Sequence, residues 1–479
     1  MLIAPLLRSG LAAAAFAATT AAQSFPSADL YLFSPALTGI GSGSGGLLRV
    51  EMATGTGTLL RNFQTTPQSQ DALAFDPYRN ALVFMAGIAP LPNILLWQCD
   101  GSGRTQSLGY PNRSFAAFAP TGNGRIYLAD RAESPAGRIH YLDAANQYQT
   151  LMDAAGAVPF EFFPGQATQY AAMIYHASTN ALFVAQQAGL SPACGGTTAS
   201  TGLIVRKVPL SVDGSRAIGP VSCVEFEVSS SGEVPVGIDA LPGGDLLVVV
   251  DTNSNAAEPR MVRIDPVAMT ASTWASNGSY TGAAATNAGC YSGSAGAVVV
   301  LDTFADVLRS FTAGQAGLGT VLPSSVPVSA AGASGEAATL AEWRGAACAG
   351  YLQSYGAGLN GSGNIAPVLV GNGCPVPGAT LDLHVSSALG GGVGVLGFGV
   401  FQIAVPLFGG TLLTTPDVIT TILLGGTPFA SGQGAVTVPF AVPADPAVSG
   451  LQLFAQGAVL DPGAIQGVSL TSGLQIVIG

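Results

Sequence analysis

The sequence predicts an all-β protein in which a six-bladed β-propeller, residues 25–345, is followed by a β-sandwich, residues 351–479. The first observation is a short apolar strand that recurs six times at spacings of 44 to 64 residues, close to the period of a four-stranded propeller blade. The second is a content of 64 glycines and 31 prolines with few stretches of helical periodicity. The third is an abrupt change of composition after residue 350.

The recurring strand is predicted to be the second strand of each blade. These second strands start at Asp29, Ala81, Arg125, Ala181, Asp245 and Ala297. Third strands follow in the same register from Gly46, Asn93, Arg138, Gly202, Met261 and Asp306. Fourth strands are predicted at 58–63, 105–108, 148–151, 221–226, 271–274 and 320–322. Turn pairs such as Asp100-Gly101 separate the strands, as tight connections require.

The innermost strands predict how the ring closes. They begin at Asp71, Ser114, Tyr170 and Val236, with a weaker fifth over 281–290 and a sixth from Ala337. The sixth has no second strand after it, whereas the second strand at Asp29 has no innermost strand before it. Because an open array would expose two sheet edges, we expect these two strands to pair and close the ring.

Two segments carry a family resemblance: RIYLADRAESPAGRIHYLD from Arg125 and DLLVVVDTNSNAAEPRMVRIDP from Asp245. Both resemble the NHL pattern of strand, Asp, turn, Asn or Arg, strand. About two thirds of the chain is therefore similar to six-bladed propellers of the NHL-repeat or regucalcin-like kind. The resemblance implies the fold. Regucalcin-like propellers include metal-dependent lactonases, but no residue of that acidic metal site is carried over to this sequence.

The N-terminus and the cysteines predict an extracellular protein. Residues 1–22 carry a lone Arg8, an apolar run and small residues before Gln23, the pattern of a secretory signal peptide. No later run reaches about 18 uninterrupted apolar residues, so we expect no transmembrane segment in the mature chain and a secreted or cell-surface location. Six cysteines allow 15 connectivities. We expect disulfides between Cys194 and Cys223 and between Cys348 and Cys374, with Cys99 and Cys290 remaining.

The charge balance disfavours nucleic acid as a partner. The chain has 27 acidic and 16 basic residues, for a formal net charge of -11, and Lys207 is its only lysine. Phosphate binding needs clustered cations. An acidic, cation-poor surface suits divalent cations or neutral glycans instead.

Residues 351–479 predict a separate module. They contain four carboxylates, one histidine and no Lys, Arg or Glu. Seven strand-like runs separated by Gly and Pro turns favour a β-sandwich; they start at Thr380, Val393, Thr411, Thr421, Ala435, Leu451 and Leu474. The segments YGAGLNGSGNIAPVLVGNGCPVPGATLDLHV and LQLFAQGAVLDPGAIQGVSLTSGLQIVIG resemble a C-terminal module attached to large secreted bacterial proteins. That resemblance implies surface retention, sorting or assembly; the alternative is a sandwich that only caps the propeller.

Candidate catalytic and metal motifs are few. The sequence has no G-x-S-x-G, and we expect structural roles for His140 and His176. Asp251, Asn253 and Asn255 begin like a calcium loop, but the twelfth position of that loop is Val262 instead of Glu, which excludes an EF-hand. Either a looser Ca²⁺ site or simple capping of a turn by Asp251 remains. Ca²⁺ is the one cofactor for which the sequence offers a basis, and none is required.

The loops that lead into innermost strands converge on one face of a propeller. There the sequence places aromatic rings beside carboxylates, a combination that suits a sugar or a cationic ligand. The predicted ligand residues are Asp71, Tyr110, Arg113, Glu161, Tyr170, Glu233, Tyr280 and Glu336. Ordinary solvated loops are the alternative for the same residues.

The sequence therefore favours a secreted, non-catalytic binding or display protein. Its propeller face would take an extracellular glycan, surface polymer or protein, and its C-terminal module would serve retention or assembly. The alternative is a metal-dependent hydrolase or lyase with an acidic site on the propeller face. A third interpretation is a purely structural matrix protein.

Overall fold

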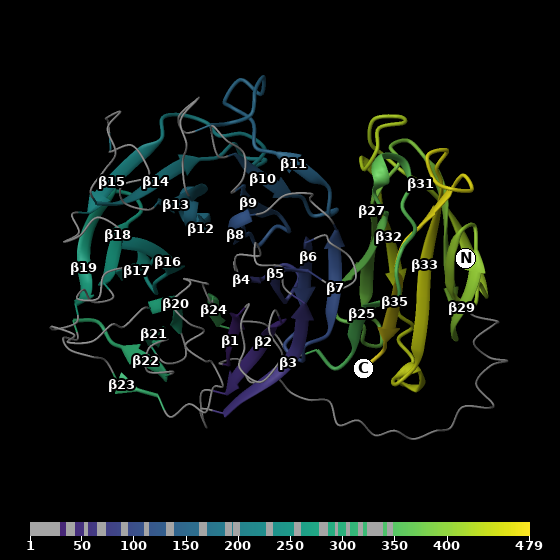
Figure 1. The fold of residues 1–479 in the computed structure, drawn as a ribbon, viewed down its shortest axis with the longest axis horizontal. Helices are drawn as coiled ribbons and strands as arrows, with labels where there is room; N and C mark the ends of the chain where they lie inside the picture. Colours follow the sequence, from purple (N-terminus) through teal and green to yellow (C-terminus); the bar gives the residue numbers. More distant parts are fainter. Residues whose placement is uncertain are drawn as a thin grey trace.

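A computed structural model describes residues 29–34, 44–51, 56–64, 73–87, 94–109, 115–130, 138–161, 170–186, 194, 202–226, 233–252, 260–276, 286–292, 296–302, 307–314, 320–322, 339–342 and 348–479. These residues form antiparallel sheets and three single-turn 3-10 helices: η1 (Ala177–Thr179), η2 (Ser362–Asn364) and η3 (Pro446–Val448). Figure 1 shows a ring of sheets beside a sandwich, drawn in green and yellow.

Six four-stranded sheets form the propeller, as the sequence predicted. Blade 1 contains β24 (Thr339–Glu342), β1 (Leu30–Ser34), β2 (Ser44–Glu51) and β3 (Thr56–Gln64). Blade 2 contains β4 (Leu73–Asp76), β5 (Ala81–Gly87), β6 (Ile94–Cys99) and β7 (Thr105–Gly109). Blade 3 contains β8 (Phe115–Pro120), β9 (Ile126–Asp130), β10 (Ile139–Leu142) and β11 (Tyr148–Thr150).

The remaining three blades repeat the same antiparallel order from the innermost strand outward. Blade 4 contains β12 (Tyr170–His176), β13 (Ala181–Gln186), β14 (Leu203–Pro209) and β15 (Ser222–Phe226). Blade 5 contains β16 (Glu233–Ala240), β17 (Leu246–Thr252), β18 (Arg260–Asp265) and β19 (Thr270–Ser276). Blade 6 contains β20 (Thr286–Ser292), β21 (Ala297–Asp302), β22 (Val307–Phe311) and β23 (Thr320–Val321).

Blade 1 closes the ring by combining strands from the two ends of the domain. β24 pairs with β1 in antiparallel register, with Thr339 opposite Phe33 and Glu342 opposite Leu30. β24 also contacts β4 of blade 2 and β20 of blade 6, so the innermost strands form a closed circle. The predicted pairing of the strand from Ala337 with the strand from Asp29 is the one observed, and it leaves the ring without an open inner edge.

Apolar clusters fill the spaces between neighbouring blades. Tyr31 and Leu47 of blade 1 pack with Phe84 and Trp97 of blade 2, and the Tyr31 hydroxyl donates a 2.9 Å hydrogen bond to the Gly101 carbonyl. Near the axis the innermost strands approach so closely that small residues are required. These interblade cores make each blade depend on its two neighbours.

Aspartates shape the tight turns at one end of the blades. Asp100 accepts hydrogen bonds from the amides of Ser102 and Arg104, and Asp265 accepts from those of Val267 and Ala268. Asp side chains favour such turns because they satisfy the local backbone donors. These turns join third strands to fourth strands, so they lie at the end of the blades opposite the predicted ligand face.

The C-terminal module is a sandwich of two main sheets with a hairpin on its surface. The larger sheet runs in the order β25 (Tyr351–Tyr355), β35 (Gly473–Val477), β33 (Gln452–Leu460), β28 (Val393–Gly399) and β31 (Val418–Leu423), with β34 (Val468–Leu470) paired to β33. The smaller sheet contains β26 (Val368–Asn372), β27 (Thr380–Ala388) and β32 (Gly434–Ala441). The hairpin contains β29 (Gln402–Leu407) and β30 (Gly410–Thr414). Leu369, Leu383, Leu396 and Leu474 belong to the core between the two sheets.

The strand count of the sandwich corrects the sequence prediction. Eleven strands form, instead of seven. The run from Val393 is two strands, β28 and β29, because the chain leaves the sheet after Gly399, where a side chain would overlap the Thr415 carbonyl oxygen. β25, β26 and β34 were not predicted.

Candidate functional site

The structure places part of the predicted ligand face. Tyr170 begins β12 opposite Gln186, and Glu233 begins β16 opposite Thr252, so both lie at the blade end from which the connections between second and third strands leave. Asp251 is the penultimate residue of β17, at the same end. These three residues are described by their backbone alone. Asp71, Tyr110, Arg113, Asn253, Asn255, Tyr280 and Glu336 lie outside the described residues.

Glu161 is the predicted ligand residue whose side chain is described. It is partly buried, and its Oε1 lies 3.3 Å from Nε of Arg138, the residue before β10. A backbone bridge joins the same two residues. The ion pair and the bridge hold Glu161 at the edge of blade 3, with the charge of its carboxylate balanced by Arg138. The roles of all these residues in ligand binding stay predictions.

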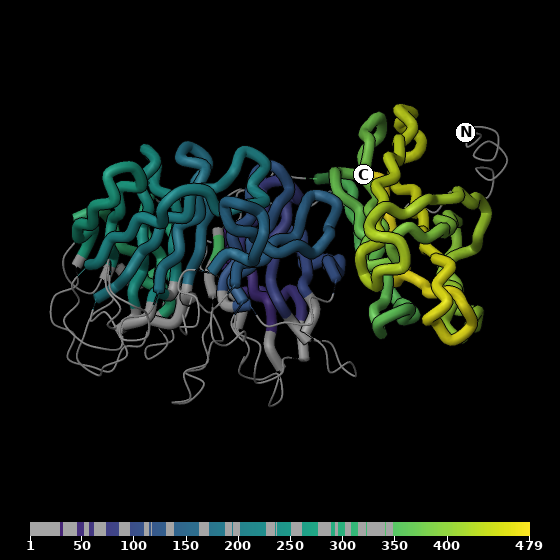
Figure 2. Tube along the Cα trace, turned by 90° about the horizontal axis from the view of Figure 1, so that it is seen from above, coloured from purple at the N-terminus to yellow at the C-terminus, as the bar shows by residue number. Residues whose placement is uncertain are grey.

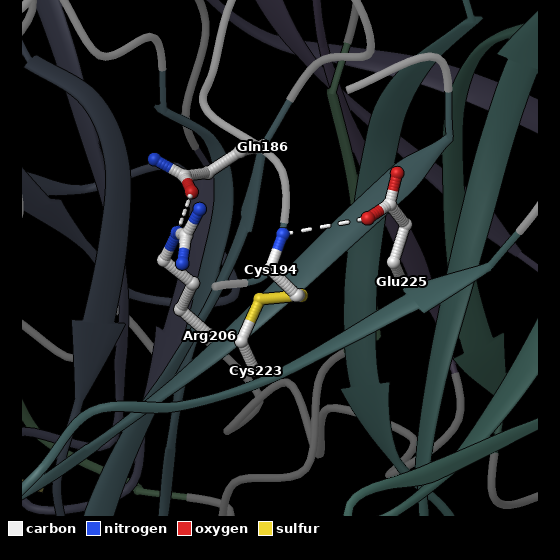
Figure 3. The surroundings of a disulfide bond; sticks show 5 residues. All are labelled: Gln186, Cys194, Arg206, Cys223 and Glu225. Carbon is white, nitrogen blue, oxygen red and sulfur yellow. Dashed lines mark hydrogen bonds between the residues drawn. A yellow bond between two sulfur atoms is a disulfide. The ribbon is translucent and has the colours of Figure 1, made fainter. Parts of the chain in front are cut away.

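A disulfide braces blade 4 at this end of the propeller (Figure 3). Cys194, between β13 and β14, is bonded to Cys223 of β15, as predicted, and its amide lies 3.4 Å from Glu225 Oε2. Beside it, Arg206 Nε donates a 2.6 Å hydrogen bond to Gln186 Oε1, and burial lowers the pKa of Arg206. Because Gln186 pairs with Tyr170, this braced layer supports the start of β12.

His140 lies in an arrangement that superficially resembles a catalytic triad. Its Nδ1 is 3.0 Å from Thr150 Oγ1, and its Nε2 is 3.6 Å from Asp130 Oδ2. Both Asp130 and His140 are 1% exposed, and the His140 ring stacks on Tyr148 at a centroid distance of 5.0 Å. A substrate could not reach a nucleophile at this buried position. The three side chains therefore form a buried polar layer within blade 3, in agreement with the structural role predicted for His140.

The other two histidines also have structural partners. Nδ1 of His176 lies 3.0 Å from Thr179 Oγ1, at the turn of η1. His384 lies in β27 between Asn372, whose Nδ2 is 3.0 Å from Nε2, and Thr437, whose Oγ1 is 2.9 Å from Nδ1. Burial, with a smaller effect of the Arg79 charge, lowers the pKa of His384 to about 4.

The protonation of His384 gives the fold a predicted pH dependence. The folded pKa of about 4 lies below the ordinary value of 6.5, so between these values the unfolded chain binds a proton that the folded chain excludes. Stability is therefore lost as the pH falls from 6.5 to about 4, by up to about 3 kcal/mol. Urea midpoints measured across this range should fall more steeply for the wild type than for His384→Gln; parallel curves would contradict the assignment.

A joint between blade 2 and the sandwich is the most elaborate polar contact that the sequence did not predict. Gln106 of β7 donates from Nε2 to the Gly371 carbonyl at 3.2 Å and accepts from the Gly371 amide at 2.9 Å. Arg104 lies with its guanidinium carbon 3.6 Å from the centroid of the Tyr351 ring. Figure 2 shows the sandwich beside the ring, and not over either of its faces.

Apolar packing and a disulfide complete the joint. Val368 and Val370 of β26 pack with Met85 and Leu108 of blade 2, whereas Leu369 faces the sandwich core. All five residues of β26 are buried, as expected for a strand covered on both faces. The predicted disulfide between Cys348 and Cys374 ties the first residues of the sandwich to the end of β26. The consecutive apolar residues Val368, Leu369 and Val370 were the signal in the sequence that could have indicated this double burial.

A buried ion pair underlies the joint on the propeller side. Arg79 Nη1 lies 2.7 Å from Asp76 Oδ2, with both side chains fully buried. Nη2 of Arg79 donates to Asn146 Oδ1 at 2.8 Å, so the pair links a turn of blade 2 to a turn of blade 3. A buried pair of this kind stabilises only while both partners are present.

A cleft of about 410 Å³ lies where blade 3 meets the sandwich. It is lined by Gln147, Tyr148, Gln149, Gly426, Thr427, Gln433 and Ala435. The lining carries amide and hydroxyl groups and no formal charge, which suits a neutral polar molecule.

The described part of the chain contains neither a cluster of metal-ligating side chains nor a membrane-spanning helix. Within it, no group of three or more His, Cys, Asp or Glu side chains is arranged to hold a metal ion. No helix in the same residues has the length and apolar character needed to cross a bilayer.

Comparisons with known proteins give distant likenesses. No family model matches the chain, and no curated protein matches it. TolB from Acinetobacter baumannii is similar at 10% identity and a TM-score of 0.36, over 65% of this chain and 66% of that chain. A candidate 6-phosphogluconolactonase from Bacteroides fragilis gives 11% identity and a TM-score of 0.39, over 65% of this chain and 97% of its own. A candidate gluconolactonase gives 14% identity and a TM-score of 0.33, over 53% of this chain and 76% of its own. At these TM-scores the likenesses decide nothing about activity, and the fold assignment rests on the sheets of this chain.

Proposed function

We propose that this chain is a secreted, non-catalytic binding protein whose sandwich holds the propeller for display. The ligand is an extracellular glycan, surface polymer or protein, bound at the blade ends where Tyr170 and Glu233 begin their strands. The sandwich, a module for surface retention or assembly, carries the propeller by its rim.

The observation that carries the proposal is the joint between β7 and β26. A flexible tether would need no buried hydrogen bonds, but here the amide of Gln106 matches both polar groups of the Gly371 backbone inside a buried contact. Breaking such a contact costs free energy because buried polar groups lose their partners. The sandwich therefore holds the ring at a fixed angle and contacts its side, not the face at which we propose that the ligand binds (Figure 2).

The chemistry of the described histidines agrees with binding better than with His-dependent hydrolysis. All three histidines of the chain are buried and hydrogen-bonded to Thr side chains. His176 lies 3.4 Å from the exposed Ser178 hydroxyl and His384 lies 2.9 Å from the exposed Thr437 hydroxyl. Among the described residues, however, neither ring is hydrogen-bonded to a carboxylate that would orient it as a general base. Binding would instead use aromatic contact and hydrogen bonds, which need no acid–base pair.

Substitution of two predicted aromatic contacts tests the proposal. The double variant Tyr170→Ala and Tyr280→Ala should weaken ligand binding by about 1 to 3 kcal/mol, roughly 5- to 150-fold, without lowering the melting temperature. Tyr78→Ala is the matched control, because Tyr78 is an exposed ring on a turn at the opposite end of the blades. Affinities would be measured by calorimetry with ligands selected from a glycan and protein panel. Equal affinity of the double variant and the wild type would exclude this face as the binding site.

A further inference from the structure

The sandwich has an open sheet edge at β31. β31 is the last strand of the larger sheet and pairs only with β28 among the described residues. Just beyond the strand, the Leu424 amide donates to the Gly392 carbonyl at 2.9 Å. Hydrogen-bonded residues alternate along an antiparallel strand, so Ile419, Thr421 and Leu423 direct their backbone N–H and C=O groups away from β28.

Apolar side chains cover the outer face of the sheet next to this edge. We call this set the outer-face patch: Val393 (41% exposed), Val395 (36%), Ile419 (57%), Leu423 (72%) and Leu460 (59%). The register places Leu423 opposite Val393 and, continued by one residue from the pair of Gly394 with Val459, Val393 opposite Leu460. A row of exposed apolar side chains thus crosses three neighbouring strands and ends at the open edge, where contiguous apolar surface marks an interaction site.

The usual protections against edge pairing are absent from β31. The strand reads VITTIL, with no Lys, Pro or inward-pointing charge, and its register with β28 has no bulge. Residues 351–479 contain no Lys, Arg or Glu at all. Monomeric proteins commonly block their edge strands with such residues because an unblocked edge recruits another strand.

We propose that β31 pairs in antiparallel register with β31 of a second copy of this chain, joining two sandwiches into one continuous sheet. This inference rests on the proposed assembly role of the C-terminal module. A two-fold axis at Thr421 would place Ile419 opposite Leu423 of the second copy and extend the outer-face patch across the junction.

Charge favours a second copy as the occupant. Asp417, one residue before β31, is the carboxylate nearest to the strand in sequence. In this register each Asp417 faces Gly425 of the other copy, so the two carboxylates lie about 26 Å apart, beyond the screening distance of about 8 Å at physiological salt. The patch itself is uncharged, so two copies meet without repulsion, whereas nothing on it would select a charged partner.

Two substitutions separate the backbone and side-chain parts of this contact. Thr421→Pro removes an N–H that points to the open edge and is not needed for pairing with β28. Leu423→Lys places a charge on the row of apolar side chains. In sedimentation equilibrium of the purified full chain, we expect the wild type to dimerise and each variant to raise the dimer dissociation constant roughly tenfold or more. Val212→Lys, on a fully exposed propeller residue, is the matched control and should dimerise like the wild type.

Each outcome decides the proposal. A wild type that stays monomeric, or two variants that dimerise as tightly as the wild type, would overturn it. Dimerisation lost in Leu423→Lys but kept in a folded Thr421→Pro would show face-to-face stacking and would overturn the edge register. Ligand binding by the propeller is measured on the same samples, so a monomeric wild type that still binds ligand would remove this inference and leave the proposed function standing.

Discussion

Removal of residues 24–63 is expected to unfold the propeller. This deletion takes away β1, β2 and most of β3, and it leaves β24 without its pairing partner. Leu30, Tyr31, Leu47 and Leu48 are at most 1% exposed. Core side chains of this size contribute about 2–5 kcal/mol each, so their joint loss reaches the whole stability of a typical domain, about 5–15 kcal/mol.

The truncation should appear as insoluble or molten protein, with no cooperative melting transition for the propeller. A chain that begins at Ser24 is the control, because it lacks only residues that precede the described strands and should melt cooperatively. The single variant Tyr31→Ala is a milder form of the same test. Its free energy of unfolding should fall by about 3–5 kcal/mol, because of the cavity and the lost hydrogen bond to Gly101. A monomeric, cooperatively folded truncation would refute closure of the ring by blade 1.

Gln106→Leu is expected to release the sandwich from the propeller rim. The substitution preserves most of the volume but leaves the amide and carbonyl of Gly371 buried without partners, at a cost of about 2–5 kcal/mol. Among the described residues, few other polar contacts cross the joint. A loss of this size should therefore separate the two domains while each stays folded.

Distances between spin labels at exposed positions Val212 and Ile465 would report this separation. The wild type should give one narrow distance distribution, and Gln106→Leu a broad one. Gln402→Leu is the matched control, since Gln402 is an exposed glutamine on the surface hairpin of the sandwich, and this variant should keep the narrow distribution. A narrow, unshifted distribution for Gln106→Leu would contradict the fixed angle on which the display proposal depends.

The propeller could be predicted from the sequence because each of its strands is a short local pattern and the pattern repeats from blade to blade. Second strands such as Ala181–Gln186 are buried along their whole length and read as short apolar runs at a regular period. The second strand at Asp29 has no innermost strand before it, and the innermost strand from Ala337 has no second strand after it. These two observations together were enough to predict ring closure. β16 begins at Glu233 instead of Val236, because the strand continues past a bulge between Pro235 and Gly237 that the apolar pattern does not show.

The joint could not be predicted because its partners are far apart in the chain. Gln106 and Gly371 are 265 residues apart, and an amide side chain in a fourth strand carries no sign of a partner in another domain. The same applies to the effect of Arg79 on His384. β25 was missed because YLQSY is polar and half-buried at the sheet edge, so neither apolar runs nor clean alternation mark it.

We propose that the propeller binds its ligand without changing it, and product analysis is the direct test. Purified protein would be incubated with its selected ligand and with a panel of lactones and glycans, with and without divalent cations, and the ligand recovered for mass spectrometry. We expect ligand that is retained by the wild type, released by the double variant Tyr170→Ala and Tyr280→Ala, and recovered chemically intact. Turnover of any of these compounds that is abolished by a chelator and by Glu233→Gln would contradict it and establish a metal-dependent enzyme.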